Sequence, residues 1–128
     1  KPVVRLNTTS DIPWEIHNVF KLFPNIQFYD YTKIKKRALK FIKGEYPKNY
    51  HLTFSLNESN YDDSIDILNQ GGNVAIVFRD KLPETYKGFK VVNGDLHDLR
   101  FTDPKNVIVG LKAKGLAKTD QSGFVINA

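Results

Sequence analysis

The sequence contains no cysteine and no methionine among its 128 residues. The absence of cysteine excludes disulfides, thiolate zinc sites, cysteine nucleophiles and cysteine-held iron–sulfur clusters within these residues. The absence of methionine, in a chain that opens with Lys1 and Pro2, predicts a fragment of a longer protein, because a translated chain begins with methionine.

Long apolar runs are also absent. No segment approaches the roughly 18 apolar residues of a membrane-spanning helix, and no signal-peptide pattern is present, so we expect no membrane partner. With 41% hydrophobic and 26% charged residues, the chain can fold around a core as a single α/β domain, 1–128. Its 19 basic and 14 acidic residues favour an anionic partner.

Short apolar runs alternate with segments of helical periodicity. The runs predict strands at 3–7, 26–31, 50–56, 73–78 and 107–111, and a short strand at 124–126. The periodic segments predict a helix from an N-cap at Ser10 to Phe23, a second helix from Lys33 to Lys43, and a short acidic helix capped by Ser59. The stretch from Leu82 to Pro104 reads as irregular. Strands joined through helices predict an α/β fold with a mostly parallel sheet and βαβ crossovers, either an open sheet or an incomplete (β/α) barrel.

Alternation along the strands predicts one apolar, helix-covered face and one polar face. Leu52 and Phe54 belong to the apolar face, and so do Val107, Val109 and Leu111. The residues predicted on the polar face are Arg5, Asn7, Ser55, Arg79 and Lys112. This pattern indicates either a polar crevice or a sheet face that another part of a longer protein covers.

Ligands of parallel α/β proteins bind beyond the carboxyl ends of the strands. We therefore predict that an anionic, phosphate-bearing ligand binds there, contacted by Arg5, Asn7, Asp30, Lys33, Ser55, Asn57, Arg79, Asp95 and Lys112. Arg5 and Arg79 are expected to converge on one anionic group, since a guanidinium can donate two parallel hydrogen bonds. In the alternative, Asp30 and Asp95 pair with these arginines. The residues leave open the reaction, any cofactor and whether the protein is an enzyme.

A second interpretation concerns the basic helix at 33–43, in which six of eleven residues are Lys or Arg. Its side chains could contact nucleic acid phosphates. The residues that would do so are Lys35, Lys36, Arg37 and Lys40. The competing interpretation is a solvated outer helix face.

No phosphate-loop, dinucleotide-binding, nucleophile-elbow or zinc-protease motif occurs in the sequence. Asp95, His97 and Asp98 could hold a divalent cation, but a plain turn and a salt bridge from Asp98 to Arg100 explain them equally well. We therefore predict no metal site.

Several segments resemble a known family. They are Val4 to Glu15 (VRLNTTSDIPWE), Gln27 to Lys33 (QFYDYTK), Tyr50 to Leu56 (YHLTFSL), Gly72 to Phe78 (GNVAIVF) and Gly110 to Gly115 (GLKAKG). Together they resemble the C-terminal half of uncharacterised phage and mobile-element proteins of the gene product eighty-eight type. The resemblance implies a cytoplasmic protein of a phage-infected or element-carrying bacterial host, with an upstream half that contains a cysteine-rich segment. It implies no particular reaction.

Overall fold

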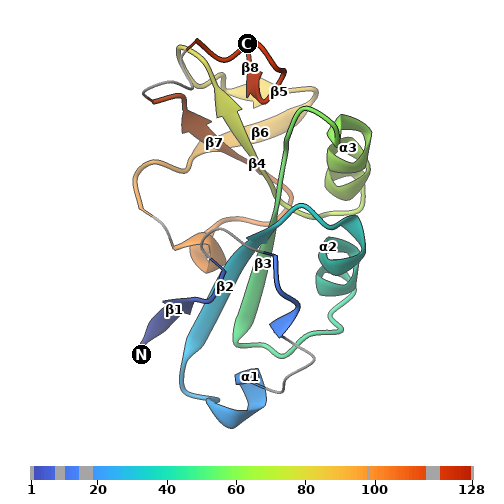
Figure 1. Ribbon diagram of the computed structural model, residues 1–128, viewed down its shortest axis with the longest axis vertical. Helices are drawn as coiled ribbons and strands as arrows, with labels where there is room; N and C mark the ends of the chain where they lie inside the picture. Colours follow the sequence, from blue (N-terminus) through green and yellow to red (C-terminus); the bar gives the residue numbers. More distant parts are fainter. Residues whose placement is uncertain (1, 8–10, 15–18, 98, 115–118, 128) are drawn as a thin grey trace.

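The computed structural model describes residues 2–7, 11–14, 19–97, 99–114 and 119–127 (Figure 1). The strands in this part of the chain are β1 (Val3–Arg5), β2 (Gln27–Thr32), β3 (Tyr50–Ser55), β4 (Val74–Phe78), β5 (Thr85–Tyr86), β6 (Phe89–Asn93), β7 (Ile108–Lys112) and β8 (Val125–Ile126). The helices are α1 (Val19–Leu22), α2 (Lys35–Ile42) and α3 (Tyr61–Asn69), with a 3₁₀ turn, η2, at Arg100–Thr102.

The strands form one open, mixed sheet in the order β1-β2-β3-β4-β7-β6-β5. Every neighbouring pair is parallel except β5 and β6, which are antiparallel. The prediction of a mostly parallel sheet is therefore confirmed, and the sheet is open because β1 and β5 occupy its two ends.

The sheet consists of two halves joined by a narrow seam. β3 and β4 pair only at Phe54 with Val74 and at Ser55 with Ala75. On the same side of β4, its carboxyl half pairs instead with β8, at Val77 and Phe78. The amino half of β3 thus lies beyond the start of β4, and η2 packs against it (Figure 1).

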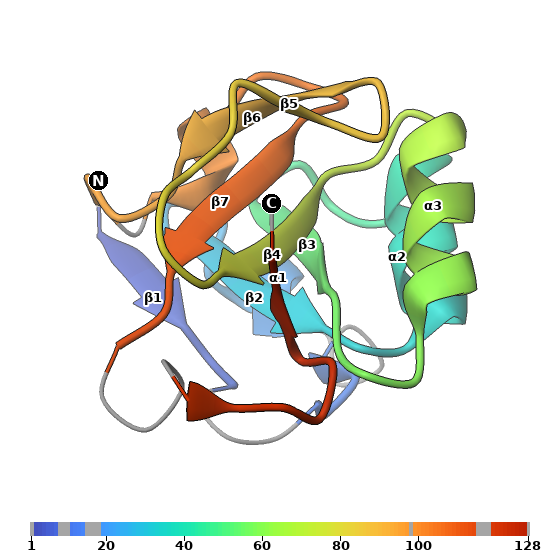
Figure 2. The ribbon, with the colours of Figure 1, turned by 90° about the horizontal axis from the view of Figure 1, so that it is seen from above.

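Helices α2 and α3 lie side by side and cover one face of the sheet (Figure 2). Their apolar side chains recur at helical spacing, so that residues such as Ala38 and Ile67 meet Phe54 in a common core. The side chains buried in this core are Ala38, Phe54, Leu56, Ile67, Leu68, Val74, Ile76, Phe78 and Ile108. A second cluster joins Phe20 of α1 to Phe28, Tyr50 and Leu52.

The face prediction for β7 is wrong. The register pairs Val74 with Ile108 and Phe78 with Lys112, which places Lys112 on the helix side of the sheet. Val107, Val109 and Leu111 consequently belong to the opposite face. Ile108 and Val109 are both fully buried, so this strand carries no amphipathic alternation from which its facing could be deduced.

The helix boundaries also differ from prediction. In the described residues the first helix is the short α1, and residues 11–13 are not helical; Ser10 lies outside the described residues. Asn60 rather than Ser59 occupies the N-cap position of α3. The Ser59 hydroxyl instead bonds back to Asn57.

The stretch predicted to be irregular contains the hairpin β5–β6. Its two-residue turn consists of Lys87 and Gly88, both with positive φ, as a type I′ turn requires. Lysine rarely occupies the first of these positions, so this turn lacks the Asn-Gly or Asp-Gly pair that identifies such hairpins in a sequence.

Candidate functional site

The residues predicted to bind a ligand fall into separate groups at the carboxyl ends of the strands. Asn7 and Asp30 join a buried hydrogen-bond network, and Asp95 lies beside Lys112. Ser55 and Asn57 are bridged by Asn60. Lys33 is exposed just before α2. Arg5 and Arg79 contact different segments.

Asp30 is the centre of the buried network and has no exposed surface. Its carboxylate accepts hydrogen bonds from the Asn7 backbone N–H at 2.8 Å and from the Tyr50 hydroxyl at 3.0 Å. The Asn7 side chain in turn accepts a bond of 2.8 Å from the Trp14 indole. Burial raises the pKa of Asp30 above its usual value, while the bonds from Asn7 and Tyr50 oppose that rise.

Arg37 of α2 extends the network to the surface. It donates to the Tyr50 hydroxyl at 2.6 Å and forms an ion pair with Asp11. Asp11 also accepts hydrogen bonds from the Thr32 hydroxyl and the Lys33 backbone N–H, each at 2.8 Å. Because these polar groups have partners within the network, the network holds α2 and the segment after β1 against the sheet. Its role is therefore structural.

Arg5 and Arg79 are not brought together. Arg5 donates to the Asn7 carbonyl and lies over the Tyr31 ring, whereas Arg79 donates to Asn127 and to the Asp120 carbonyl. Their strands are separated by β2 and β3, which corresponds to about 14 Å of sheet. Each arginine therefore positions its own loop.

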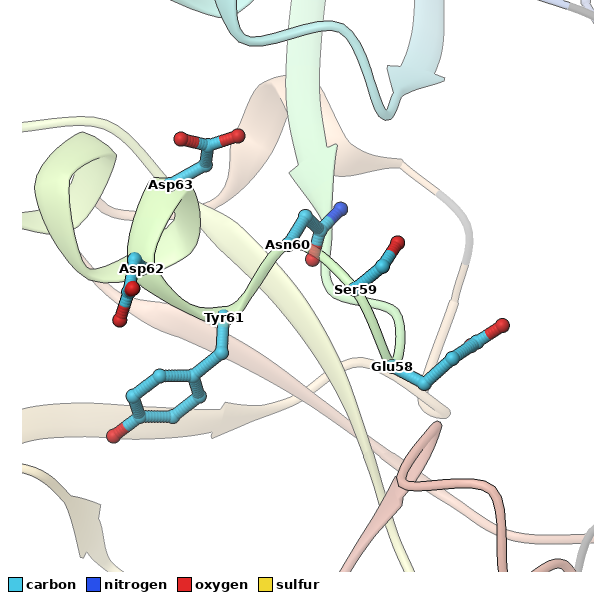
Figure 3. Close-up of a pocket in the computed structure, with 6 residues that line it drawn as sticks. All are labelled: Glu58, Ser59, Asn60, Tyr61, Asp62 and Asp63. Carbon is cyan, nitrogen blue, oxygen red and sulfur yellow. The ribbon is translucent and has the colours of Figure 1, made fainter.

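A pocket of about 320 Å³ follows β3 and is lined by Glu58, Ser59, Asn60, Tyr61, Asp62 and Asp63. The side chains of Glu58, Tyr61 and Asp62 point in different directions (Figure 3). Asp63 lies 3.6 Å from Lys35 of α2. Three carboxylates at this position are unsuited to a phosphate-bearing ligand.

The basic part of the carboxyl edge lies at the adjacent strands β4 and β7. A cavity of about 290 Å³ is lined there by Val77, Asp95, Leu111, Lys112, Ala113, Lys114 and Phe124. Asp95 accepts a hydrogen bond of 2.9 Å from the Lys112 backbone N–H, and its other oxygen lies 3.4 Å from Lys114 Nζ. Asp95 therefore holds the end of β7 in place through the Lys112 backbone. Among the described residues, its carboxylate forms no ion pair with the Lys112 ammonium.

The sequence pattern of the gene product 88 family matches residues 1–128, the whole chain. The chain belongs to this family. No curated protein and no solved structure matched it. Among the described residues of this gene product 88 protein, no helix is long and apolar enough to cross a membrane.

The basic helix of the gene product 88 fold differs from the prediction at two of its four residues. Lys35 pairs with Asp66 of α3 at 2.6 Å, and the Arg37 side chain is buried in the network described above. Lys36 and Lys40 are exposed. Arg37 is therefore unavailable for phosphates because it is committed to Asp11 and Tyr50.

Sequence reasoning missed several residues that the fold brings together. Asp11 and Tyr50 join the network from loops and strands distant in sequence, and no local pattern indicates them. His51, Arg100 and Asp103 gather at the amino edge of the sheet, where β3 extends past β4. The sequence offered one signal for the group of His51, Arg100 and Asp103, which is that Arg100 stands in a short segment rich in acidic residues.

Proposed function

We propose that the cavity at the carboxyl ends of β4 and β7 binds a small anionic, phosphate-bearing ligand, with Lys112 and Lys114 as its cationic contacts. The observation that carries the proposal is that both lysines line one cavity with a single carboxylate, Asp95, which leaves an excess of positive charge. Lys112 is the exposed last residue of β7, so its long side chain can extend from the helix side around the strand end towards this cavity.

The lining of the cavity supports a ligand with an apolar part beside the phosphate. Val77, Leu111 and Phe124 supply apolar lining, and the two lysines are further lining residues. Phe124 belongs to the segment that Arg79 holds through Asn127 and the Asp120 carbonyl. Arg79 is thus assigned a positioning role for the wall of the cavity, in place of the direct ligand contact expected from sequence.

Thermal unfolding and calorimetry with phenyl phosphate and inorganic phosphate test the proposal, with phenol as the probe that lacks phosphate. A ligand that binds only the native state raises the melting temperature, by an amount equivalent to about 2.7 kcal/mol at 100 times its Kd. The double variant Lys112→Ala, Lys114→Ala should lose this stabilisation. Lys90→Ala, which removes an exposed lysine of β6 outside the cavity, should retain it. Equal responses to phenol and phenyl phosphate would contradict the proposal.

A second candidate function is nucleic acid binding by the exposed lysines of the basic helix. Lys36 and Lys40 lie one turn apart on α2, and Lys33 and Lys43 flank the helix; none of the four forms an ion pair among the described residues. This set replaces Lys35 and Arg37, whose charges are already paired.

Fluorescence polarisation with single-stranded and duplex DNA separates this candidate from the first. Lys36→Glu with Lys40→Glu should abolish binding, and the logarithm of the affinity should fall steeply with the logarithm of salt concentration. Lys112→Ala serves as the control that leaves DNA binding intact. Binding unchanged by the charge reversal would exclude the helix as the contact surface.

We also propose that the protein acts in the cytoplasm of a phage-infected or element-carrying bacterium. The resemblance of the chain to phage and mobile-element proteins supports this location, and so does its membership of the gene product 88 family. Cell fractionation of an infected host with an antibody to the protein would test it, and recovery in the membrane or extracellular fraction would contradict it.

A further inference from the structure

The narrow seam between β3 and β4 creates a notch at the amino edge of the sheet. Because β4 begins opposite Phe54, the preceding residues of β3 have no strand beside them on that side. A cavity of about 320 Å³ occupies this place. Its lining residues are Phe41, Ile42, Gly44, His51, Leu52, Gly71, Gly72, Asn73, Phe101, Asp103 and Lys105.

The backbone of β3 offers hydrogen-bonding groups to this notch. Phe54 and Leu56 donate their N–H groups to the Asn73 and Ala75 carbonyls at 3.1 and 3.0 Å. Since the hydrogen-bonding direction of a strand repeats every two residues, Leu52 presents its N–H on the same side, where the notch replaces β4.

Two residues that line the cavity carry a buried polar atom without a hydrogen bond. They are His51 Nδ1 and Asp103 Oδ2, which have no hydrogen-bond partner within the described ranges of the chain. Asp103 Oδ2 also forms an ion pair with Arg100, which is not among the lining residues. The side chains of Arg100 and Asp103 are only 1% and 7% exposed, and Nε of the first lies 3.3 Å from Oδ2 of the second. Buried polar atoms without hydrogen bonds are uncommon and costly, so two of them at one cavity indicate a site for a ligand.

The groups in the notch are complementary to a neutral ligand that donates hydrogen bonds. Arg100 balances the charge of Asp103, whose Oδ2 remains an acceptor. Burial and the nearby Arg100 lower the pKa of His51 to about 4, so the imidazole is neutral at pH 7 and has one donor and one acceptor nitrogen. The Phe41 and Phe101 rings provide apolar surface for a planar molecule.

We propose that this notch binds a planar nitrogen heterocycle with an exocyclic amino group, the class to which amino-bearing nucleobases belong. The amino group donates to Asp103 Oδ2, a ring nitrogen or N–H pairs with His51 Nδ1 or the Leu52 backbone, and the ring packs against Phe101. The size of the cavity supports a small ligand, since it lies at the lower end of the roughly 300–1,000 Å³ range of ligand pockets. The notch lies at the opposite edge of the sheet from the cavity lined by Lys112 and Lys114, here called the lysine cavity, so the two proposals are independent.

Calorimetry and two-dimensional NMR titrations with free adenine and cytosine test the proposal on the whole chain. We expect saturable binding with a Kd of about 1 mM or tighter, and chemical-shift changes at Leu52, Phe101 and Asp103. Purine, which has the adenine ring without its amino group, should bind at least tenfold more weakly.

Two variants identify the contacts. His51→Phe preserves a ring of similar size beside Phe41 and removes both nitrogens, and Asp103→Asn preserves the side-chain shape and removes the charge. Each should weaken adenine binding at least tenfold while circular dichroism shows a folded protein. Asp62→Asn, a change to a carboxylate in the pocket after β3, is the matched control and should leave binding unchanged.

Three outcomes would overturn the proposal. They are no saturable binding of either amino-bearing base, equal affinities for adenine and purine, and adenine binding that survives both notch variants. Because the probes carry no phosphate, each of these results leaves the lysine cavity proposal untouched.

Discussion

The Tyr50 hydroxyl donates a hydrogen bond of 3.0 Å to Asp30 Oδ2 and accepts one of 2.6 Å from Arg37. Tyr50 and Asp30 are 1% and 0% exposed, so the interaction is shielded from water. The hydroxyl thereby links a carboxylate of β2 to a guanidinium of α2, and this link fixes the helix on the sheet.

Removal of this hydroxyl should destabilise the protein without changing its fold. Tyr50→Phe leaves a buried carboxylate with one fewer donor, which should cost about 1–3 kcal/mol in the free energy of unfolding. Urea denaturation measures the change. Tyr29→Phe removes a hydroxyl for which no hydrogen bond is described, from a tyrosine that is 9% exposed, and should change stability by less than about 0.5 kcal/mol. Similar losses in both variants would refute a specific role for the Tyr50 hydroxyl.

Arg37 should tolerate substitution far less well than its neighbour Lys36. Arg37→Met leaves Asp11 without its ion-pair partner and removes the donor to the Tyr50 hydroxyl. Loss of one member of a buried ion pair lowers the free energy of unfolding by about 3–5 kcal/mol. Because Asp11 is partly exposed, water should solvate its carboxylate and reduce this loss. Lys36→Met changes an exposed residue and should stay within about 0.5 kcal/mol. Thermal unfolding of the two variants provides the comparison, and equal melting temperatures would show that the pair contributes nothing.

His51 should make the protein less stable as the pH falls from 7 to 4. The pKa of His51 is about 4 in the folded protein and 6.5 for the ordinary side chain, so between these values the unfolded chain binds a proton that the folded chain does not. Stability from this group is complete above pH 6.5 and is lost as the pH falls towards 4, by about 3 kcal/mol in total.

Urea titrations of the wild type and of His51→Phe at several pH values isolate this effect. The free-energy difference between the two proteins should change steadily between pH 6.5 and 4 and become constant below pH 4. A difference that is independent of pH would mean that the imidazole is solvated as freely in the folded state as in the unfolded state.

The hairpin turn offers a stabilising substitution. Lys87 adopts a φ of 53°, a conformation that asparagine tolerates better than lysine. Lys87→Asn should therefore stabilise the protein by about 0.5–1 kcal/mol, less the small contribution of the Lys87 ammonium over the Tyr86 ring. Lys90→Asn, in the neighbouring strand, should be neutral or destabilising because asparagine has low strand propensity. A loss of stability in Lys87→Asn would show that the ring contact outweighs the backbone preference.

The candidate site could be predicted only in outline. Asp95 and Lys112 were both predicted among the ligand contacts, and they are adjacent because Asp95 follows β6 and Lys112 ends the neighbouring strand β7. The rule that ligands bind beyond the carboxyl ends of the strands could not anticipate that Asp30 would be buried under α2, since burial of an aspartate depends on donors supplied by Asn7 and Tyr50 from other parts of the chain. The prediction that Arg5 and Arg79 converge is wrong for a related reason. The order of the strands in the sheet separates the two residues, and sequence spacing does not encode that order.

The sequence by itself determined the five principal strands, the helices α2 and α3 and the parallel pairing of the first four strands, because hydrophobic periodicity and the length of the connections act locally. Tertiary structure alone decided the facing of β7, the two-residue seam between β3 and β4, the burial of His51, and the partners of Arg37 and Arg79. These features depend on register and on side chains far apart in the chain. A strand buried on both faces has no alternation to set its facing, and a polar side chain is buried only where the fold supplies its partner.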